Sequence, residues 1–463
     1  MKYLPLMAMV CTLLASANAT AQENEVASFY YDDEIPGVVF GVSGNGRWAV
    51  GNDEGVVANN SFVWTRETRF TDIFGINAQG VQVQGLAARL YGIADDGTAV
   101  GVYEDGTVGL SSNPIRPGVY KDGEWTPLPT LIDLFPGDLN GYATAISADG
   151  SIICGHVPAS VVTNDVLGNT VTTAGPCVPV IWVDGEIQRV DDVEYEGYGA
   201  WIQSMNADGT VMCGYADFGD GSRSPAVFKD GQLIRLIGTT PASSDPGKWE
   251  GFFEGRVYAV SPDGSRVGGY FSPIEGQVNG FVWDVPETIT STSVESDEVE
   301  YLDGIATAVD ANGRVYIGGA SGGNSSVVAD GQTASFIDYF GITDAPHIPA
   351  AIMGISADAR TFATSFVMSN QMGAVQFPMV VSFDSASGIE DEYSDGLALS
   401  YAAGHFTVEG NHGGIIVYTT GGLMVKSVGS EVSDLDLSSL GDGIYLVKVL
   451  FDGGHKVMKV VVD

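Results

Sequence analysis

The chain has 463 residues, and 58 acidic residues against 20 basic ones give it a formal net charge of −38. That balance argues against nucleic acid or an anionic membrane as the partner, because both bind through patches of Lys and Arg. The 62 glycines follow no collagen-like period and accompany Val, Ile, Tyr and Trp, which favours many strands joined by tight turns.

The first residues have the pattern of a secretory signal peptide. Lys2 provides a positive end, residues 4–14 form an apolar run too short to span a bilayer, and small residues suited to cleavage follow. We expect cleavage before Gln22, which removes residues 1–21. Since no later apolar run is long enough for a membrane helix, we expect an exported chain without a transmembrane segment.

A short turn motif recurs seven times, at intervals of roughly 50 residues, and organises most of the chain. In each copy an aliphatic strand enters the turn, most turns end in Asp-Gly or Asn-Gly, and a second strand follows. The copies lie at 42–46, 93–97, 146–150, 205–209, 260–264, 309–313 and 355–359, the last with Ala359 in place of Gly. A period near 50 with strand-like content is typical of propeller blades, each a four-stranded sheet.

The second half of each repeat adds a third strand with an aromatic residue near its end and, in four repeats, a second Asp-Gly turn before a fourth strand. The recurring aromatic residue is best explained by packing between blades. The seventh repeat lacks a fourth strand, and we expect residues 27–31 to supply it and close the ring. The sequence therefore predicts an all-β fold with a seven-bladed β-propeller over residues 22–384.

These repeats resemble the HAF family of extracellular repeats over roughly residues 37–384. The shared pattern is a Ser/Asn-x-Asp/Asn-Gly turn, a valine-rich strand ending in Gly, and a strand of Ala-Phe-x-Trp type followed by Asp/Asn-Gly. Residues 146–185 and 205–231 match it well. The resemblance implies a secreted repeat protein, but no particular ligand or catalytic set, because the family shares none.

A polar, acidic linker over 385–396 separates the repeats from short alternating strands in residues 397–463, which predict a small C-terminal β-sandwich. This tail resembles the C-terminal sorting domain of type IX secretion cargo; the matching residues include Gly443, Ile444, Tyr445, Leu446, Val447, Lys448 and Lys459. The resemblance implies recognition by the secretion machinery and delivery, through the periplasm, to the medium or outer cell surface of a Gram-negative bacterium. An ordinary terminal sandwich domain is the alternative.

The longer connections of the predicted propeller, at 103–117, 156–179, 236–258 and 340–352, share the face opposite the short Asp-Gly turns, and binding residues usually occupy such loops. Two neighbouring links between blades on this long-loop face, 191–201 and 248–256, are rich in aromatic and acidic residues. We expect their aromatic side chains to bind a glycan or a protein, or alternatively to pack between blades: Tyr195, Tyr198, Trp201, Trp249, Phe252 and Phe253.

The sequence assigns no catalytic residue, metal site or cofactor. Its histidines form no metal-ligand pair, and no Gly-x-Ser-x-Gly elbow joins a strand to a helix. A structural calcium at 217–222 is an alternative that we do not predict, because the acidic residues there lack regular spacing. Cys154 and Cys213 hold equivalent repeat positions and are expected to pack in a core, while the odd number of cysteines after residue 21 leaves room for at most one disulfide.

We therefore expect a secreted or cell-surface propeller, monomeric, that binds a glycan or a protein through its long-loop face. The competing expectations are a propeller enzyme, either a glycoside hydrolase or a lyase acting on extracellular polysaccharide, and a structural surface component. Converging carboxylates in a deep pocket would favour the enzyme, whereas an aromatic patch would favour binding.

Overall fold

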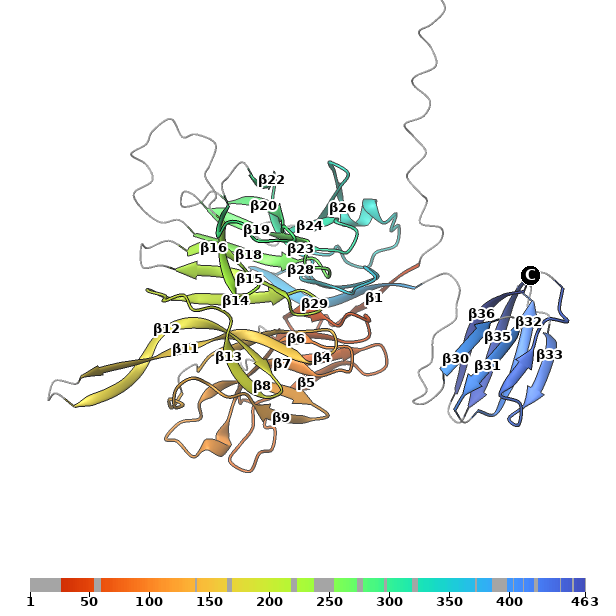
Figure 1. Cartoon of the computed structure of the whole chain (residues 1–463), viewed down its shortest axis with the longest axis horizontal. Helices are drawn as coiled ribbons and strands as arrows, with labels where there is room; N and C mark the ends of the chain where they lie inside the picture. Colours follow the sequence, from red (N-terminus) through yellow and green to blue (C-terminus); the bar gives the residue numbers. More distant parts are fainter. Residues whose placement is uncertain are drawn as a thin grey trace, which may run out of the picture. The chain divides into compact units, whose positions relative to one another are not determined.

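The computed structural model describes residues 26–462 apart from 54–59, 138–139, 165–168, 218–222, 237–253, 273–277, 295–297, 319–323, 371–372, 385–397, 403, 411, 420–423, 442 and 452–453. The chain divides into two compact units, Met1–Phe383 and Asp384–Asp463. The first unit is a ring of antiparallel sheets, and the second contains two small sheets (Figure 1). The predicted fold class, a seven-bladed β-propeller followed by a β-sandwich, is confirmed.

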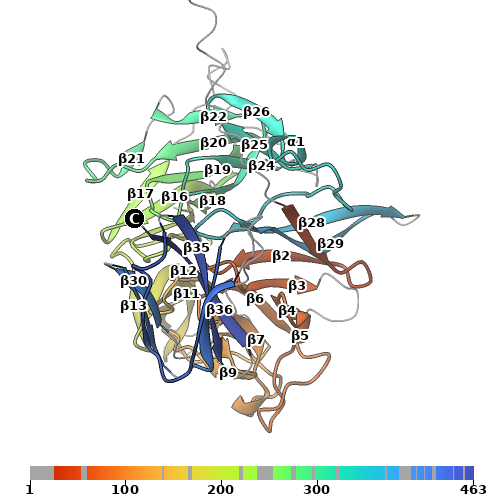
Figure 2. The same ribbon diagram turned by 90° about the vertical axis from the view of Figure 1, so that its right-hand side faces the viewer.

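In the first six blades the four strands follow one another from the inside of the ring outwards, and the fourth and fifth blades are joined into one sheet by a parallel bridge between Arg223 and Glu254 (Figure 2). The first three blades are β2 (Gly37–Val42), β3 (Ala49–Asp53), β4 (Ser61–Thr65) and β5 (Arg69–Ile73); β6 (Ala88–Ile93), β7 (Ala99–Glu104), β8 (Ile115–Lys121) and β9 (Glu124–Pro127); and β10 (Tyr142–Ile146), β11 (Ile152–Asn164), β12 (Thr170–Val183) and β13 (Glu186–Arg189). A 3₁₀ turn, Gly106–Val108, lies between β7 and β8.

The fourth blade is β14 (Ala200–Met205), β15 (Val211–Asp217), β16 (Arg223–Lys229) and β17 (Gln232–Leu236). The fifth is β18 (Glu254–Val260), β19 (Arg266–Ser272), β20 (Asn279–Asp284) and β22 (Glu300–Leu302), with the short β21 (Ser293–Val294) pairing back to β17. The sixth is β23 (Ile305–Val309), β24 (Val315–Gly318), β25 (Ser326–Ala329) and β26 (Gln332–Ser335), followed by the one-turn helix α1 (Phe336–Tyr339).

The seventh blade combines strands from both ends of the propeller unit. β27 (Gly354–Ile355), β28 (Thr361–Asn370) and β29 (Gly373–Asp384) are consecutive, and β1 (Val26–Tyr31) pairs with β29 as the outermost strand. β2 of the first blade lies beside β27 and β28, so the ring is closed (Figure 2). The ring of Tyr30 in β1 packs 5.1 Å from that of Trp64 in the first blade, so the closing strand contacts two blades.

The inner turn of each blade, between its first and second strands, is held by its own side chains. In the third blade the Gly150 N–H donates to the Ser147 carbonyl at 2.9 Å, and the φ of +78° at Gly150 favours glycine. The Asp149 carboxylate accepts from the Ser147 hydroxyl at 2.7 Å and from the Ser151 N–H at 3.0 Å. These bonds lower the pKa of Asp149 to about 2. The same bonds recur at Asp263, which explains the repeated Ser-x-Asp-Gly-Ser pattern.

The outer turns use the same Asp-Gly dipeptide in a different conformation. In Asp122-Gly123 and Asp184-Gly185 both residues have positive φ, with values from 51° to 90°. Positive φ at both central residues is the type I′ geometry that joins two strands directly. In the inner turns only the last residue is left-handed, which is glycine in six blades and Ala359 in the seventh, so the flanking residues decide which turn an Asp-Gly forms.

The core of the propeller lies between neighbouring blades. The third-strand aromatic residues Trp64, Trp182 and Phe228 are completely buried and pack among aliphatic side chains of the second strands. Burying side chains of this size contributes several kcal/mol each at roughly 25 cal/mol per Å² of apolar surface. The blades are therefore joined mainly by apolar contact rather than by hydrogen bonds between sheets.

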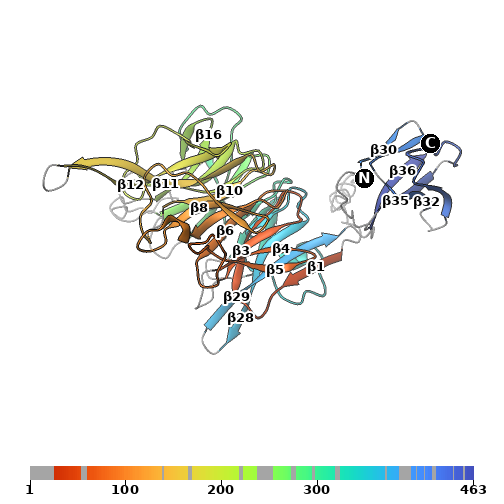
Figure 3. The same ribbon diagram turned by 90° about the horizontal axis from the view of Figure 1, so that it is seen from below.

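One connection differs from the sequence expectation. Residues 156–179, expected to be one of the long loops, continue β11 and β12 as a long hairpin that pairs from His156 with Pro179 to Asn164 with Thr170, with one shift of register between Pro158 and Ser160. β28 and β29 form a second long hairpin, and both extend from the body of the ring (Figure 3). The expectation was wrong because Thr- and Val-rich segments pair once a neighbouring strand is present, even without strict alternation.

The C-terminal unit consists of two sheets that enclose one core. One sheet is β30 (Ala398–Ala402), β31 (His405–Glu409) and β34 (Asp434–Asp436); the other is β33 (Met424–Gly429), β32 (Gly414–Thr419), β35 (Gly443–Phe451) and β36 (Gly454–Val462). Phe406, Ile415 and Val447 are fully buried between them. No helix in the described parts of the chain is long and apolar enough to cross a membrane.

Candidate functional site

The innermost strand of the first six blades carries a β-bulge at the same place, two residues before the turn motif. The register slips there in β2, β6, β10, β14, β18 and β23, leaving one residue of each strand unpaired. A bulge interrupts the regular alternation of side chains along a strand, so the extra side chain points in a different direction from its neighbours. Here the unpaired residues line the central cavity, together with Met353 just before β27; this bulge ring is Phe40, Tyr91, Thr144, Gln203, Tyr258, Thr307 and Met353.

The residue after each bulge is always small, for a steric reason. A Cβ at Gly41 would lie 2.7 Å from the Tyr91 carbonyl oxygen of the next blade, and one at Gly92 would lie 3.0 Å from the Cα of Ala145. Neighbouring inner strands approach one another closely at this level. Small residues at this position therefore allow the bulged side chains to converge.

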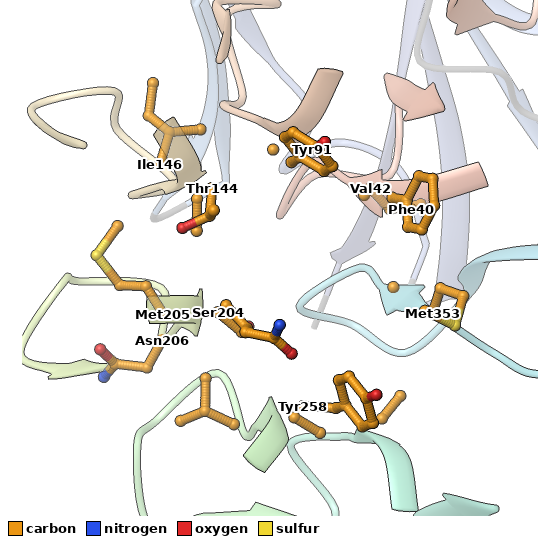
Figure 4. A pocket seen from close by; sticks show the side chains of 18 of the residues that line it. Phe40, Val42, Tyr91, Thr144, Ile146, Ser204, Met205, Asn206, Tyr258 and Met353 are labelled. Atoms are coloured by element: carbon orange, nitrogen blue, oxygen red, sulfur yellow. The ribbon is translucent and has the colours of Figure 1, made fainter. Parts of the chain in front are cut away.

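The cavity inside the ring has a volume of about 460 Å³, within the usual range for small-molecule sites. Figure 4 shows Phe40, Tyr91, Thr144, Tyr258 and Met353 surrounding one central space from different blades. The residues that line it in the described part of the chain are uncharged. Their arrangement is asymmetric, because adjoining blades seven, one and two provide Met353 and two aromatic rings, whereas blades three to six provide the hydroxyl groups of Thr144, Tyr258 and Thr307 and the amide of Gln203.

The inner turns restrict one end of the cavity. Backbone hydrogen bonds link turns of adjacent blades: the Ala148 N–H donates to the Ala207 carbonyl at 2.9 Å, and the Ala357 N–H donates to the Gly44 carbonyl at 2.8 Å. The Ala207 N–H donates in turn to the Pro262 carbonyl. Since proline has no N–H, this series of hydrogen bonds between turns ends at Pro262. These links fix the spacing of the turns, and the opposite end of the cavity lies towards the long-loop face.

His156 lies on the cavity wall near that end. Its ring stacks on Trp201 of the next blade, with centroids 4.2 Å apart, and lies 5.0 Å from Tyr142. Burial lowers the pKa of His156 to about 3, and the nearby backbone of Ile202 only partly offsets that effect. Burial also raises the pKa of Tyr91 to about 12, with Tyr142 adding to the shift. Both side chains are therefore uncharged near neutral pH.

Of the aromatic residues expected to bind ligand, Trp201 lines the cavity, but its ring is engaged in packing. It stacks on His156 and on Tyr215, at 4.2 Å and 5.7 Å between centroids, and its Nε1–H donates to the Tyr198 carbonyl at 3.2 Å. The Trp201 ring therefore packs between two blades.

Tyr195 and Tyr198 have other partners. Tyr195 is 7% exposed and donates its hydroxyl to Asp191 at 2.6 Å, which fixes it inside the link. Tyr198 is 62% exposed, with the Arg223 guanidinium 4.6 Å from its ring centroid. Trp249, Phe252 and Phe253 lie outside the described residues.

An ion-pair cluster lies beside Tyr215, where the fourth and fifth blades meet. Glu254 is 3.0 Å from the Arg256 guanidinium and 3.6 Å from that of Arg223. The Arg256 guanidinium also lies 4.9 Å from the centre of the Tyr215 ring. Since one carboxylate is shared by two half-buried arginines that also contact aromatic rings, this cluster joins the blades rather than forming a carboxylate pair.

Neither metal-binding nor disulfide chemistry is apparent in the described residues. They contain no group of three or more His, Cys, Asp or Glu side chains placed to hold a metal ion. At the calcium alternative, the Asp217 carboxylate accepts the Tyr198 N–H at 3.1 Å, and 218–222 lie outside the described residues. Cys154 and Cys213 are buried free thiols, and Cys177 is a partly buried one.

The sequence reasoning missed the bulge ring. A signal was present, because the position two residues before each turn motif is variable and is followed by Gly, Ala or Ser and then by the first residue of the motif, which is apolar. Variation at one position of an otherwise regular repeat marks a place where side chains are not needed for blade packing.

No protein-family model matches the chain, and no similar sequence is found among curated proteins. Solved structures do resemble it. TolB from Acinetobacter baumannii is 16% identical over 64% of this chain and 62% of TolB, with a TM-score of 0.35. PorZ, an essential bacterial surface component of the type IX secretion system of Porphyromonas gingivalis, is 13% identical over 90% of this chain and 58% of PorZ, with a TM-score of 0.36.

An oligogalacturonate lyase in complex with manganese is 11% identical over 78% of this chain and 97% of the lyase, with a TM-score of 0.42. The chain thus spans less than two thirds of the TolB and PorZ structures. At these identities the likeness concerns the fold alone.

Proposed function

We propose that this protein is an exported carbohydrate-binding protein whose ligand enters the central cavity from the long-loop face. The observation that carries the proposal is the uncharged, asymmetric bulge ring. A sugar ring has an apolar face of C–H groups and an edge of hydroxyl groups. The apolar side of the cavity, which includes Met353, Phe40 and Tyr91, suits the C–H face of a sugar ring. The polar side, which includes Thr144 and Gln203, suits the hydroxyl groups at its edge.

Binding a glycan fits this cavity better than the other activities considered. Glycoside hydrolysis uses two carboxyl groups on either side of the scissile bond, and the described lining residues supply neither. A folded protein partner would meet only the rim of a hollow of about 460 Å³. A sugar of one or a few rings matches its volume and its polarity.

Export is the second part of the proposal and rests on the two ends of the chain. The N-terminal segment has the pattern of a signal peptide, and the tail resembles the sorting domain of type IX cargo. The matching run from Gly443 to Lys448 lies in β35, a central strand of its sheet between β32 and β36, and Lys459 lies in β36. The proposed location is the medium or the outer surface of a Gram-negative bacterium.

The test is a glycan array probed with the full mature chain, followed by calorimetric titration of the glycans that bind. Replacing Tyr91 with Ala should weaken binding at least tenfold, because it removes a ring from the apolar side of the cavity. Tyr198→Ala is the matched control, since Tyr198 is exposed on the long-loop face and is not among the cavity-lining residues.

Unchanged affinity in Tyr91→Ala together with loss in Tyr198→Ala would move the site to the links between blades. A chain that binds no glycan but captures a protein through that face would refute the carbohydrate proposal.

A further inference from the structure

Arg89 lies at the long-loop end of the cavity, beside two tyrosines that line it. It precedes Tyr91 by two residues in β6, which runs from Ala88 towards the inner turn, so Arg89 is on the long-loop side of Tyr91. Arg89 is exposed, and its guanidinium hydrogen-bonds the Tyr91 hydroxyl. The same guanidinium acts electrostatically on Tyr142 of the next blade, whose ring centroid lies 5.9 Å from that of Tyr91. A solvent-accessible cation therefore lies against the cavity wall.

The hydrogen bond from Arg89 decides what the Tyr91 hydroxyl can offer to a ligand. A guanidinium only donates, so the hydroxyl oxygen accepts and its O–H remains available as a donor. Burial raises the pKa of Tyr91 to about 12, so the O–H keeps its proton near neutral pH. Arg89 and Tyr91 thus present N–H and O–H donors side by side. A carboxylate fits such a pair because both of its oxygens are acceptors, whereas a sugar hydroxyl would leave its own donor unpaired there.

Arg89 belongs to a level of the propeller that carries no acidic residue. The position two residues before each member of the bulge ring is occupied by Val38, Arg89, Tyr142, Trp201, Arg256, Ile305 and Ala351. Two of these seven residues are arginine, although the whole chain has 58 acidic residues against 20 basic ones. The long-loop end of the cavity is therefore bordered by positive charge in a chain that is otherwise strongly acidic.

The two arginines of this level differ in their surroundings. The Arg256 guanidinium lies 3.0 Å from the Glu254 carboxylate, in the ion-pair cluster that joins the fourth and fifth blades. Among the described residues, no carboxylate contributes to the raised pKa of Tyr91 or of Tyr142, whereas Arg89 acts on both hydroxyls. The net charge of −38 does not cancel this local effect, because exposed charges are largely screened beyond about 8 Å at physiological ionic strength. Arg89 is thus the cation that a ligand in this part of the cavity would meet.

We propose that the central cavity binds glycans that contain hexuronic acid, and that Arg89 binds the carboxylate of the sugar. This inference rests on the carbohydrate-binding function proposed above and names its ligand class. A guanidinium has five N–H donors in a planar fork, so it can bind a planar carboxylate through two of them while it keeps its bond to Tyr91. The carboxylate of a hexuronate is attached directly to the sugar ring. The ring then lies against the aromatic rings of Tyr91 and Tyr142, and the next sugar reaches the uncharged bulge ring.

The first experiment changes the ligand and leaves the protein intact. Calorimetric titration of the full mature chain compares oligosaccharides of galacturonate, glucuronate and mannuronate with their methyl esters and with the corresponding neutral hexose oligosaccharides. A methyl ester keeps the sugar ring and removes the charge. The acid that binds most tightly should do so about tenfold or more tightly than its ester. Equal affinity for acid and ester would overturn the inference, whatever the behaviour of any variant.

The second experiment changes Arg89. Arg89→Met removes the charge and keeps an apolar stem, so it should lose about tenfold or more in affinity for the acid and should no longer distinguish acid from ester. Arg89→Lys keeps the charge without the planar fork and should lie between the two proteins. Arg47→Met is the matched control, because Arg47 is an exposed arginine that follows an inner turn, on the face opposite the long loops. An Arg89→Met protein that still prefers the acid would refute the role of Arg89.

The outcomes separate this inference from the proposed function. If neutral oligosaccharides bind as tightly as hexuronates and Tyr91→Ala weakens their binding, the carbohydrate site stands and the acidic ligand class is refuted. A preference for sulfated over carboxylated sugars, measured with sulfated galactose oligosaccharides, would refute the carboxylate. If the native chain binds no member of the panel, the proposed function fails and the inference fails with it.

Discussion

Replacing His156 with Phe should remove a loss of folding stability that the native propeller suffers at acidic pH. Burial lowers the pKa of His156 from 6.5 to about 3, so between these values the unfolded chain binds a proton that the folded chain does not. Stability therefore falls as the pH falls from 6.5 towards 3, and above 6.5 this effect is absent. Tyr142, which lies against the imidazole, stays neutral throughout because burial raises its pKa.

The loss of stability depends on how far the pH lies below the pKa of His156 in the unfolded chain. At pH 5 the difference from the unfolded pKa is about 1.5 units, and at about 1.4 kcal/mol per unit the native chain loses about 2 kcal/mol. His156→Phe has no such loss. The difference in unfolding free energy between variant and native protein should therefore grow by about 2 kcal/mol between pH 7.5 and pH 5. Carboxylates such as Asp149, shared by both proteins, cancel in the difference.

Urea denaturation at several pH values measures this difference directly. All seven tryptophans lie in the propeller unit, so tryptophan fluorescence reports its unfolding separately from that of the C-terminal unit. Parallel pH profiles for the two proteins would refute the argument, because they would mean that the imidazole gains its proton equally in the folded and unfolded states.

Three further changes test the fold and the export proposal. Ala359 has a φ of +55° where the other inner turns have glycine, so Ala359→Gly should raise the unfolding free energy by about 0.5–1 kcal/mol. The reverse change Gly150→Ala should lower the unfolding free energy. A lower unfolding free energy in both variants would contradict the argument from backbone strain. Removing residues 22–32 deletes the outermost strand of the seventh blade and should lower the melting temperature by roughly 5 °C or more, whereas an unchanged value would show that β1 does not stabilise the ring. Deleting residues 385–463 should leave the protein in the periplasm, as judged by cell fractionation, and surface display of the truncated chain would refute sorting by the tail.

The expected binding residues illustrate a limit of composition-based reasoning. Tyr195, Tyr198 and Trp201 are close in sequence, yet one is buried on Asp191, one is exposed under Arg223, and one is stacked between blades. An aromatic-rich link is compatible with packing and with binding, because both use the same apolar area. Only the partners of each ring distinguish the two roles.

The sequence by itself determined the repeat and its turns. A turn such as Ser147-Ala148-Asp149-Gly150 is specified by a few consecutive residues, whose side chains bond to their own backbone, and its copies count the blades. Alternating strands between the turns specify the sheets for the same local reason.

The tertiary structure alone decided where the central cavity lies and which side chains line it. Phe40 and Tyr91 are turned into the cavity by bulges, which exist only when each strand pairs with its neighbour, and they meet across roughly 50 residues of sequence only because the ring closes. His156 is an ordinary histidine in the sequence, and its burial becomes apparent only when the next blade places Trp201 against it. Such features depend on contacts between blades, which no local pattern encodes.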